Sequence, residues 1–231
     1  MHIPDGYLSP QTYVPFYGVA VVLWGIALSK IKQTLSSKYI PYLAMAAAFS
    51  FLVMMFNIPV PGGTTGHAVG AGIIAVLLGP WTAVIAVSTV LIIQAIVFGD
   101  GGITAIGANC FNMAVVMPFV SYWTFSLVRG NATSGKRVYA AAFFSGYLGL
   151  SSASVAAAIE VGIQPMIAHA ADGRPLYAPY SLSITLPAMV LGYFLLFGIF
   201  EGVVTMLLFK YFSRNAPDLI YAFRKDNRPK T

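Results

Sequence analysis

Six long hydrophobic segments, separated by short polar or glycine-rich stretches, dominate the chain. A helix needs roughly 17–25 mostly apolar residues to cross the hydrocarbon core of a bilayer. The segments that meet this length are Tyr13–Ser29, Tyr39–Asn57, Trp81–Phe98, Ala105–Val128, Val138–Glu160 and Ser183–Phe209. The hydrophobic pattern by itself therefore predicts six transmembrane helices.

A seventh apolar segment, Ala68–Leu78, is glycine-rich and too short to be assigned by length. It is followed by Gly79 and Pro80, so it reads either as a re-entrant segment or as a short span. A short crossing segment is tolerated where neighbouring protein buries it and its irregular ends line a cavity.

The positions of the basic residues decide between these two readings. Lysine and arginine beside apolar spans mark cytoplasmic loops. Three such clusters are Lys30, Lys32 and Lys38; Arg129, Lys136 and Arg137; and Lys210, Arg214, Arg224, Lys225, Arg228 and Lys230. They fall on one side of the membrane only if Ala68–Leu78 crosses it. We therefore expect an all-α integral membrane protein of about seven transmembrane helices, with the N-terminus outside and the C-terminus cytoplasmic. Residues 1–210 would form a single transmembrane domain, and 211–231 a basic cytoplasmic tail.

Composition supports a membrane protein. Of the 231 residues, 58% are hydrophobic and only 9% are charged, whereas a soluble domain carries about 25% charged residues. The net charge of +6 lies beside the spans and so does not indicate nucleic-acid binding. The single cysteine, Cys110, excludes an intrachain disulfide. No basic segment precedes an apolar core at the N-terminus, so we expect no cleaved signal peptide and a mature chain that begins at Met1.

The outer loops in this topology collect the polar chemistry of the chain. They hold His2, His67 and His169, together with Asp5, Asp100 and Asp172, and Glu160 lies at their edge. A concentration of ionisable groups on one face of an apolar protein points to a function on that face.

The first two residues form a natural metal chelator. The Met1 amine, the His2 amide nitrogen and His2 Nδ1 are linked covalently, and together they would occupy three corners of a square around one ion. Histidine at position 2 leaves the fourth corner open. A tetragonal set of nitrogen donors suits Ni(II) or Cu(II).

His67 is the natural fourth ligand. It ends a proline- and glycine-rich segment that begins at Ile58, lies on the same side as the N-terminus and leads into the short crossing segment. Taken singly, His2 and His67 also read as a solvated histidine and a hydrogen-bonded loop histidine. His169, in a long polar loop, is expected to be solvated, with transient attraction of metal as the other reading.

Several motifs resemble the substrate-capture (S) component of nickel/cobalt energy-coupling-factor (ECF) transporters, the CbiM/NikM family. They are Met1-His-Ile-Pro-Asp-Gly-Tyr-Leu-Ser-Pro10, Gly63-Thr-Thr-Gly-His67, Leu78-Gly-Pro-Trp81, Gln94 with Phe98-Gly-Asp-Gly-Gly102, and Gly107-Ala-Asn-Cys-Phe-Asn-Met113. The resemblance spans residues 1 to about 210. It implies that the N-terminus folds into the bundle and that Met1, His2 and His67 form a square-planar metal site. It also makes Gln94, Asp100, Asn109 and Asn112 candidates for supporting that site; each reads equally well as a polar group packed between helices.

The resemblance also implies partners. An S component performs no chemistry; a transmembrane coupling (T) subunit and an ABC ATPase pair drive uptake, and a small accessory membrane protein helps to load the metal. No phosphate-binding loop occurs in the sequence, so the ATPase is expected to be a separate subunit. Nickel or cobalt is the transported substrate, nickel first, and no cofactor is expected.

Two other classes of protein remain as alternatives. A self-sufficient secondary transporter or channel for divalent metal would place ionisable groups within the spans, and Glu201 in the last span is such a group. A membrane enzyme needs a nucleophile beside an activating base. The stretch Thr64–His67 is the one suggestive cluster, and it lacks the Gly-x-Ser-x-Gly context.

Overall fold

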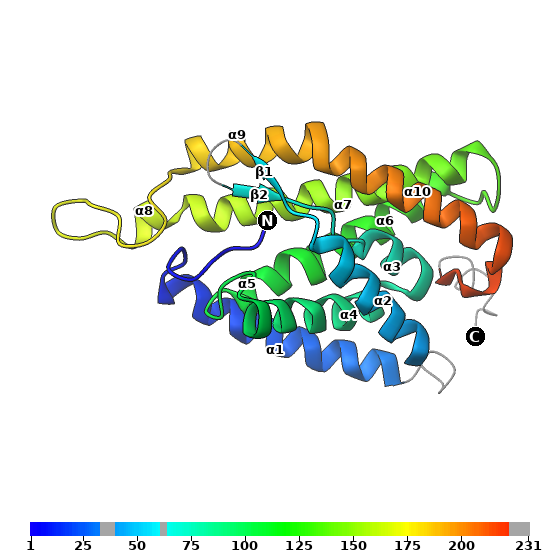
Figure 1. The fold of residues 1–231 in the computed structure, drawn as a ribbon, viewed down its shortest axis with the longest axis horizontal. Coiled ribbons are helices and arrows are strands. Elements are labelled where there is room, and N and C mark those ends of the chain that lie inside the picture. The colour runs from blue at the N-terminus through cyan, green and yellow to red at the C-terminus, as the bar shows by residue number, and fades with distance from the viewer. Residues whose placement is uncertain (33–39, 61–63, 222–231) are drawn as a thin grey trace.

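A computed structural model of the chain describes residues 1–32, 40–60 and 64–221. The described residues form a bundle of helices with one short β-hairpin (Figure 1). The elements in chain order are α1 (Pro10–Lys32), α2 (Ile40–Met54), β1 (Ile58–Val60), β2 (Thr64–Gly66), α3 (Ala71–Leu78), α4 (Pro80–Ile93), η2 (Gln94–Phe98), α5 (Ile106–Asn109), η3 (Cys110–Val116), α6 (Met117–Arg129), α7 (Lys136–Gly162), α8 (Gln164–Ile167), α9 (Leu182–Gly192), η4 (Tyr193–Phe197), α10 (Gly198–Asn215) and η5 (Pro217–Leu219). The predicted all-α membrane fold is confirmed.

Five helical stretches are long and apolar enough to cross a membrane, counting only the described residues. They are Pro10–Lys32, Pro80–Phe98, Ile106–Arg129, Lys136–Ile167 and Leu182–Asn215. The 15-residue α2 and the eight-residue α3 complete a set of seven helical segments in that part of the chain. Three long stretches include π-helical turns, η2, η3 and η4, that continue the neighbouring α-helices without a break.

In the short apolar segment Ala68–Leu78, the helix covers only part of the apolar residues. The helix begins at Ala71 rather than Ala68, because Gly70 adopts a left-handed conformation with φ of 74° and starts the helix. Residues Ala71 to Leu77 are all buried. Neighbouring helices therefore surround α3, as a crossing segment of this length requires.

The predicted end of the second span is also altered by a hairpin. The helix α2 ends at Met54, before the expected Asn57, and β1 then pairs antiparallel with β2. Ile58 is registered with Gly66 and Val60 with Thr64. This pairing satisfies the backbone of a proline-rich segment that cannot continue the helix. His67 follows the hairpin directly, at the point where the chain enters the bundle.

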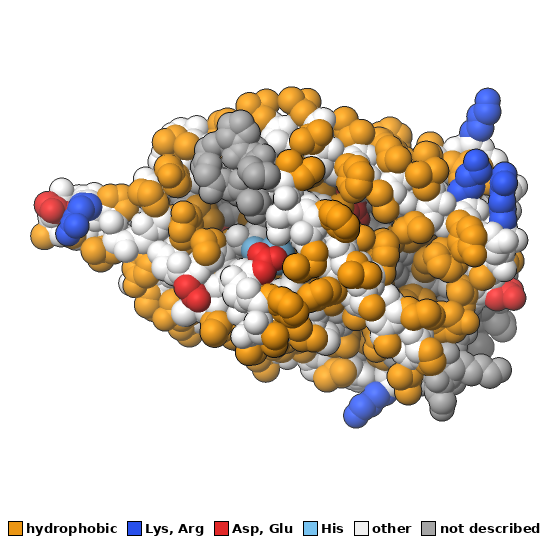
Figure 2. Space-filling model, viewed as in Figure 1, with side chains coloured by type: hydrophobic (Ala, Val, Ile, Leu, Met, Phe, Trp, Pro, Cys, Tyr) orange, Lys and Arg blue, Asp and Glu red, His pale blue; other side chains and the backbone are white. Residues whose placement is uncertain are grey.

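The basic ends of the helices gather at one end of the molecule. Figure 1 places the end of α1, the connection between α6 and α7, and the end of α10 at the same end of the bundle. Figure 2 shows lysine and arginine side chains at that end and a broad hydrophobic surface between the two ends. The expected clustering is thus present for the described members of the three basic clusters, while Figure 2 also shows a basic side chain at the opposite end. Lys38 and the tail residues 224–230 lie outside the described residues.

The C-terminal boundary predicted at residue 210 falls inside a helix. The helix α10 continues to Asn215, and Ile220, five residues further on, is fully buried against the bundle. The first part of the segment predicted as a tail therefore packs with the transmembrane domain. Residues 222–231, the rest of that segment, lie outside the described residues.

Candidate metal-binding site

The N-terminal residues lie inside the bundle rather than in solvent. Met1 and Ile3 are each 3% exposed and belong to the hydrophobic core, and the His2 side chain is 6% exposed. Figure 1 shows the N-terminus in the middle of the bundle, between the helices. A free amine in such a place loses its hydration, so burial requires a compensating interaction or a neutral amine.

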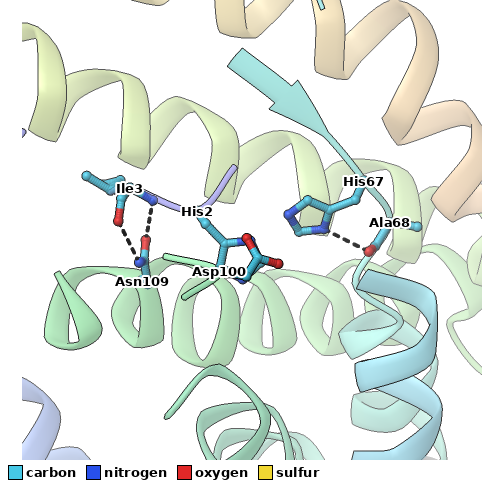
Figure 3. A network of polar contacts seen from close by, with 6 residues as sticks. All are labelled: His2, Ile3, His67, Ala68, Asp100 and Asn109. Carbon is cyan, nitrogen blue, oxygen red and sulfur yellow. Dashed lines mark hydrogen bonds and ion pairs between the residues drawn. The ribbon is translucent and has the colours of Figure 1, made fainter. Parts of the chain in front are cut away.

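A network of hydrogen bonds holds the N-terminal segment in place. The Ile3 N–H donates to Asn109 Oδ1 at 2.9 Å, and Asn109 Nδ2 donates back to the Ile3 carbonyl at 3.1 Å (Figure 3). The Gly102 N–H also donates to the Ile3 carbonyl at 2.9 Å. Asp5 accepts hydrogen bonds from the N–H groups of Ile103 and Thr104 at 3.0 and 2.8 Å. These bonds fix the segment on both sides of residue 3.

A second anchor lies further along the segment. The Ser9 N–H donates to Gln164 Oε1 at 2.9 Å, and Gln164 Nε2 donates to Thr12 Oγ1 at 3.0 Å. Gln164 is fully buried at the junction of α7 and α8. This anchor was not identified from the sequence, because nothing in the local pattern indicates that residues 9 and 164 meet.

Two glycines allow the loop after η2 to approach the N-terminal segment. A Cβ atom at Gly102 would lie 2.4 Å from the backbone nitrogen of Asp5, and one at Gly101 would lie 3.3 Å from His2 Cδ2. Any side chain at residue 102 would therefore push the two backbones apart. Gly101 and Gly102 thus serve close packing around the first residues.

The two candidate histidines meet inside the bundle. The rings of His2 and His67 stack with a centroid separation of 4.7 Å and an interplanar angle of 23°. His67 is 1% exposed, and its Nδ1 lies 3.0 Å from the Ala68 carbonyl oxygen (Figure 3). A carbonyl oxygen only accepts hydrogen bonds, so Nδ1 carries the proton and Nε2 presents a lone pair. His67 Nε2 and His2 Nε2 are buried and have no hydrogen-bond partner among the described residues.

The supporting residues proposed from the sequence occupy different places. His2 Nδ1 lies 3.5 Å from Asp100 Oδ1, and the Gln94 amide is next to the His2 ring. Gln94 is fully buried, and within the described chain neither polar atom of its amide makes a hydrogen bond of normal geometry. Asn109 binds Ile3, as described above. Asn112 instead donates to Glu160 Oε2 at 2.8 Å, on α7.

The buried environment favours the neutral forms of the nitrogen groups. Burial lowers the pKa of the Met1 amine to about 5, although the Asp100 charge opposes this shift. Burial, and next the amine, lower the pKa of His2 to about 3. Burial also holds the pKa of His67 well below its usual value. At neutral pH these groups therefore present lone pairs without first releasing a proton.

The carboxylates near the site differ in their surroundings. Burial raises the pKa of the half-buried Asp100 carboxyl, against the opposing influence of the amine. Asp5 has a lowered pKa, chiefly because Thr104 donates a hydrogen bond to it. Asp100 is thus the acid next to the histidines, and Asp5 is a structural anchor.

His169 lies away from this cluster. It is exposed in the loop between α8 and α9, where it forms an isolated bridge with Pro175, and its Nδ1 lies 3.2 Å from the Ala170 carbonyl oxygen. It has the solvated environment expected for it. Across the described ranges, no group of three or more His, Cys, Asp or Glu side chains is arranged to hold a metal ion.

Comparison with proteins of known structure shows the class of this fold. The chain matches the crystal structure of a truncated transition metal transporter with a TM-score of 0.89 and 44% identity, covering 93% of this chain and 99% of that one. A second crystal structure of a transition metal transporter covers 99% of this chain and 100% of that one, at 42% identity and the same TM-score. The fold is that of a multi-pass membrane transporter of prokaryotic type.

The family model described as the cobalt uptake substrate-specific transmembrane region, CbiM, matches residues 2–219. The chain belongs to this family, and the resemblance noted in its motifs is confirmed. It is 49% identical over 230 residues to the fused nickel transport protein NikMN of Rhodobacter capsulatus, covering 99% of this chain and 66% of that protein. It is 38% identical over 147 residues to the cobalt transport protein CbiM of Ruminiclostridium cellulolyticum, covering 62% of this chain and 59% of that protein. Both relatives are named as transport proteins.

Proposed function

We propose that this chain is the substrate-binding S component of an ECF-type importer and that it binds Ni²⁺ or Co²⁺ at its outer end. The observation that carries this proposal is the burial of the first two residues against His67, with the two imidazole rings stacked at 4.7 Å. A flexible terminus gives up much conformational entropy when it is buried. A chelating role for residues 1 and 2 accounts for that arrangement.

Four nitrogen atoms form the proposed ligand set. Met1 supplies its amine, and His2 supplies its amide nitrogen and Nδ1. His67 supplies Nε2, because its Nδ1 is committed to the Ala68 carbonyl. The three donors of the N-terminal dipeptide are linked covalently, so only His67 has to be positioned by the fold.

Binding requires the two rings to leave their stacked arrangement. An imidazole lone pair lies in the plane of its ring, and the ion binds about 2 Å from the nitrogen. Two rings stacked at a centroid separation of 4.7 Å cannot both direct lone pairs at one ion at that distance. We therefore infer that the His2 ring turns about its side-chain bonds when the ion arrives, while the bonds of Ile3 hold the backbone.

Gln94 and Asp100 are suited to support the bound state. When Nδ1 of His2 binds the ion, its proton belongs on Nε2, and the adjacent Gln94 carboxamide oxygen is available to accept it. Asp100, which faces His2 Nδ1 at 3.5 Å, supplies negative charge beside the ion. A divalent cation with one ionised amide and one carboxylate is formally neutral, and this lowers the cost of burying it.

Nickel is our first choice of substrate and cobalt the second. A square-planar set of nitrogen donors favours Ni(II), although Co(II) can use the same atoms. The Rhodobacter capsulatus relative is named as a nickel transport protein, and the Ruminiclostridium cellulolyticum relative as a cobalt transport protein. Both names are consistent with this choice of ions.

Partners complete the proposed transporter. A transmembrane T subunit and an ABC ATPase pair would drive uptake, and a small accessory membrane protein would help to load the ion. The matching family is described as substrate-specific, which supports a division of labour between binding and energy supply. The chain itself spans 66% of the fused Rhodobacter capsulatus relative.

The decisive experiment adds two glycines before Met1, because a single added residue would place the histidine third in the chain, where the amine, two amides and the imidazole complete a four-nitrogen chelate by themselves. The extension moves the terminal amine away from its chelate position and leaves every side chain unchanged. We expect the extended protein to fold normally but to lose Ni²⁺ after purification, measured by elemental analysis and equilibrium titration. The same two glycines added after Thr231 are the control. Full retention of Ni²⁺ by the N-terminally extended chain would refute ligation by the Met1 amine.

A self-sufficient secondary transporter or channel remains the second candidate. It is favoured by two buried carboxylates in the spans, Glu160 and Glu201, which are 5% and 0% exposed. Purified chain in liposomes would then take up metal without ATPase partners. Uptake that appears only when the T subunit and ATPase pair are present would instead support the S component.

A further inference from the structure

The buried carboxylate of Glu201 lies behind the segment that carries His67. Glu201 is 0% exposed in the first turn of α10. Its Oε2 accepts a hydrogen bond from the Val69 N–H at 2.8 Å, and Oε1 and Oε2 accept from the Gly70 N–H at 3.0 and 3.1 Å. Val69 and Gly70 follow His67 by two and three residues. The carboxylate therefore fixes the backbone next to the imidazole.

The same contact completes the start of α3. The first N–H groups of a helix have no acceptor within the helix, and Gly70 at this position provides no side-chain hydrogen bond. Glu201, on another helix, accepts a hydrogen bond from the backbone of Gly72 in this first turn, as well as those from Val69 and Gly70 just before it. A Cβ atom at Gly70 would lie 2.5 Å from the Phe49 ring, so the backbone is also held from the opposite element, α2.

Glu201 is one of three residues, spaced by four, that contact the His67 segment from one long helical stretch. The Tyr193 hydroxyl forms a hydrogen bond with the backbone of His67. The Phe197 ring occupies the space beside Gly66, where a Cβ atom would lie 1.9 Å from the ring. Tyr193 and Phe197 are the first and last residues of the π-helical turn η4, which leads directly into α10, and such turns frequently occur at functional sites.

We propose that Glu201 is a positioning residue for the metal site, holding His67 through the backbone of Val69 and Gly70 so that Nε2 can reach an ion bound by the N-terminus. This inference rests on the proposed function, because it requires His67 to be a ligand. Glu201 acts without touching the ion, since both of its oxygens are used by backbone N–H groups. The last helical stretch, Leu182–Asn215, therefore orients His67, the residue that supplies the fourth proposed ligand.

Glu201→Gln is the central variant. It keeps the side-chain volume but replaces one acceptor with an NH₂ donor, which faces backbone donors. Replacing groups that orient a metal ligand weakens metal binding by about 10–100-fold, and we expect a loss in this range for Ni²⁺ titrated into the purified full-length chain. The visible absorption band of bound Ni(II) should shift towards that of His67→Ala. Thr205→Val, a buried and nearly isosteric change one turn further along α10, is the control and should bind Ni²⁺ like the wild type.

A double-mutant cycle separates positioning from general stability. If Glu201 acts only through His67, the Glu201→Gln/His67→Ala double variant should bind Ni²⁺ no more weakly than His67→Ala alone. A purely structural role would make the two losses add. The single His67→Ala variant tests the proposed function independently: unchanged binding there refutes ligation by His67, whereas a loss there with additive effects refutes only the role of Glu201.

Three further results bear on the proposed role of Glu201. Wild-type affinity and spectrum in Glu201→Gln, or an equal loss in Thr205→Val, would overturn the proposal. If Glu201→Gln cannot be purified in a folded form, Tyr193→Phe removes only the hydroxyl at the His67 backbone. It should then weaken Ni²⁺ binding and show no additional loss in the His67→Ala background. A Tyr193→Phe variant with wild-type affinity and spectrum would count against control of His67 by this helical stretch.

Discussion

His2 and His67 are 65 residues apart in the sequence, yet their rings stack inside the bundle at a centroid separation of 4.7 Å. Hydrogen bonds that hold two separate segments bring the rings together. The N-terminal segment is tied to Asn109 and Gly102, and the His67 segment is tied to Glu201. The two histidines therefore meet where these two segments come together, and both side chains are shielded from water there.

Replacing either histidine should abolish tight metal binding. His2→Ala or His67→Ala removes a proposed ligand, so the loss of Ni²⁺ affinity should exceed the roughly 10–100-fold effect typical of groups outside the ligand set. Isothermal titration of the purified protein measures it. His169→Ala, which changes an exposed loop histidine, is the matched control and should bind normally. A similar loss in all three variants would argue against a specific role for the buried pair.

Proton competition should reveal the unusual state of the amine. The Met1 amine has a pKa of about 5 and His2 one of about 3, so both are neutral above pH 6 and release no proton when the ion binds. The amide of His2 still releases one proton. The affinity should therefore rise by about tenfold per pH unit between pH 6 and 8, and more steeply below about 5, where the protonated amine also competes.

The slope of this dependence distinguishes the possible ligand sets. An amine with the ordinary pKa of 8.0 would release a second proton throughout that range. A flat affinity between pH 6 and 8 would instead exclude ionisation of the amide. Calorimetric titrations in buffers with different ionisation enthalpies count the protons released and decide between these cases.

Asn109 should matter because it holds the backbone next to the chelate. Asn109→Ala removes both bonds to Ile3 and leaves the buried groups of Ile3 without that partner, which costs about 1–3 kcal/mol. We expect weaker Ni²⁺ binding and faster hydrogen exchange in the first residues. Asn215→Ala, at the exposed end of α10, removes an asparagine bond far from the site and serves as the control. Unchanged exchange in Asn109→Ala would mean that the segment is held by its other anchors.

A single methyl group at residue 102 should displace the N-terminal segment. The Cβ of Gly102→Ala would lie 2.4 Å from the backbone nitrogen of Asp5, a contact that only movement of the backbone can relieve. The variant should lose Ni²⁺ while the thermal unfolding of the bundle changes little. Gly18→Ala in α1, where a Cβ meets nothing within 4 Å, is the matched control and should bind Ni²⁺ normally. Normal binding by Gly102→Ala would contradict the need for close packing at the loop.

The sequence does not predict the hairpin β1–β2 or the residue at which the short helix α3 begins. The apolar run from Ala68 to Leu78 was recognised as a crossing segment from the charge distribution, but its helix starts only at Ala71. The left-handed Gly70 starts the helix there, and the carboxylate of Glu201, from a distant part of the chain, accepts hydrogen bonds from the N–H groups of Val69 and Gly70. Asn112 likewise belongs to a motif close to Asn109, yet it bonds to Glu160 on another helix.

The sequence by itself determined the membrane fold, and it predicted an orientation for that fold and a set of candidate ligands. Hydropathy and basic residues act locally, because each segment partitions between lipid and water largely on its own composition. The chelating dipeptide is also local, since its three donors are covalently linked. Only the tertiary structure decided that the terminus is buried, which loop glycines admit it, and which carboxylate orients His67. Those features depend on packing between segments far apart in the sequence, such as residues 5 and 102 or residues 69 and 201, and no local pattern records such contacts.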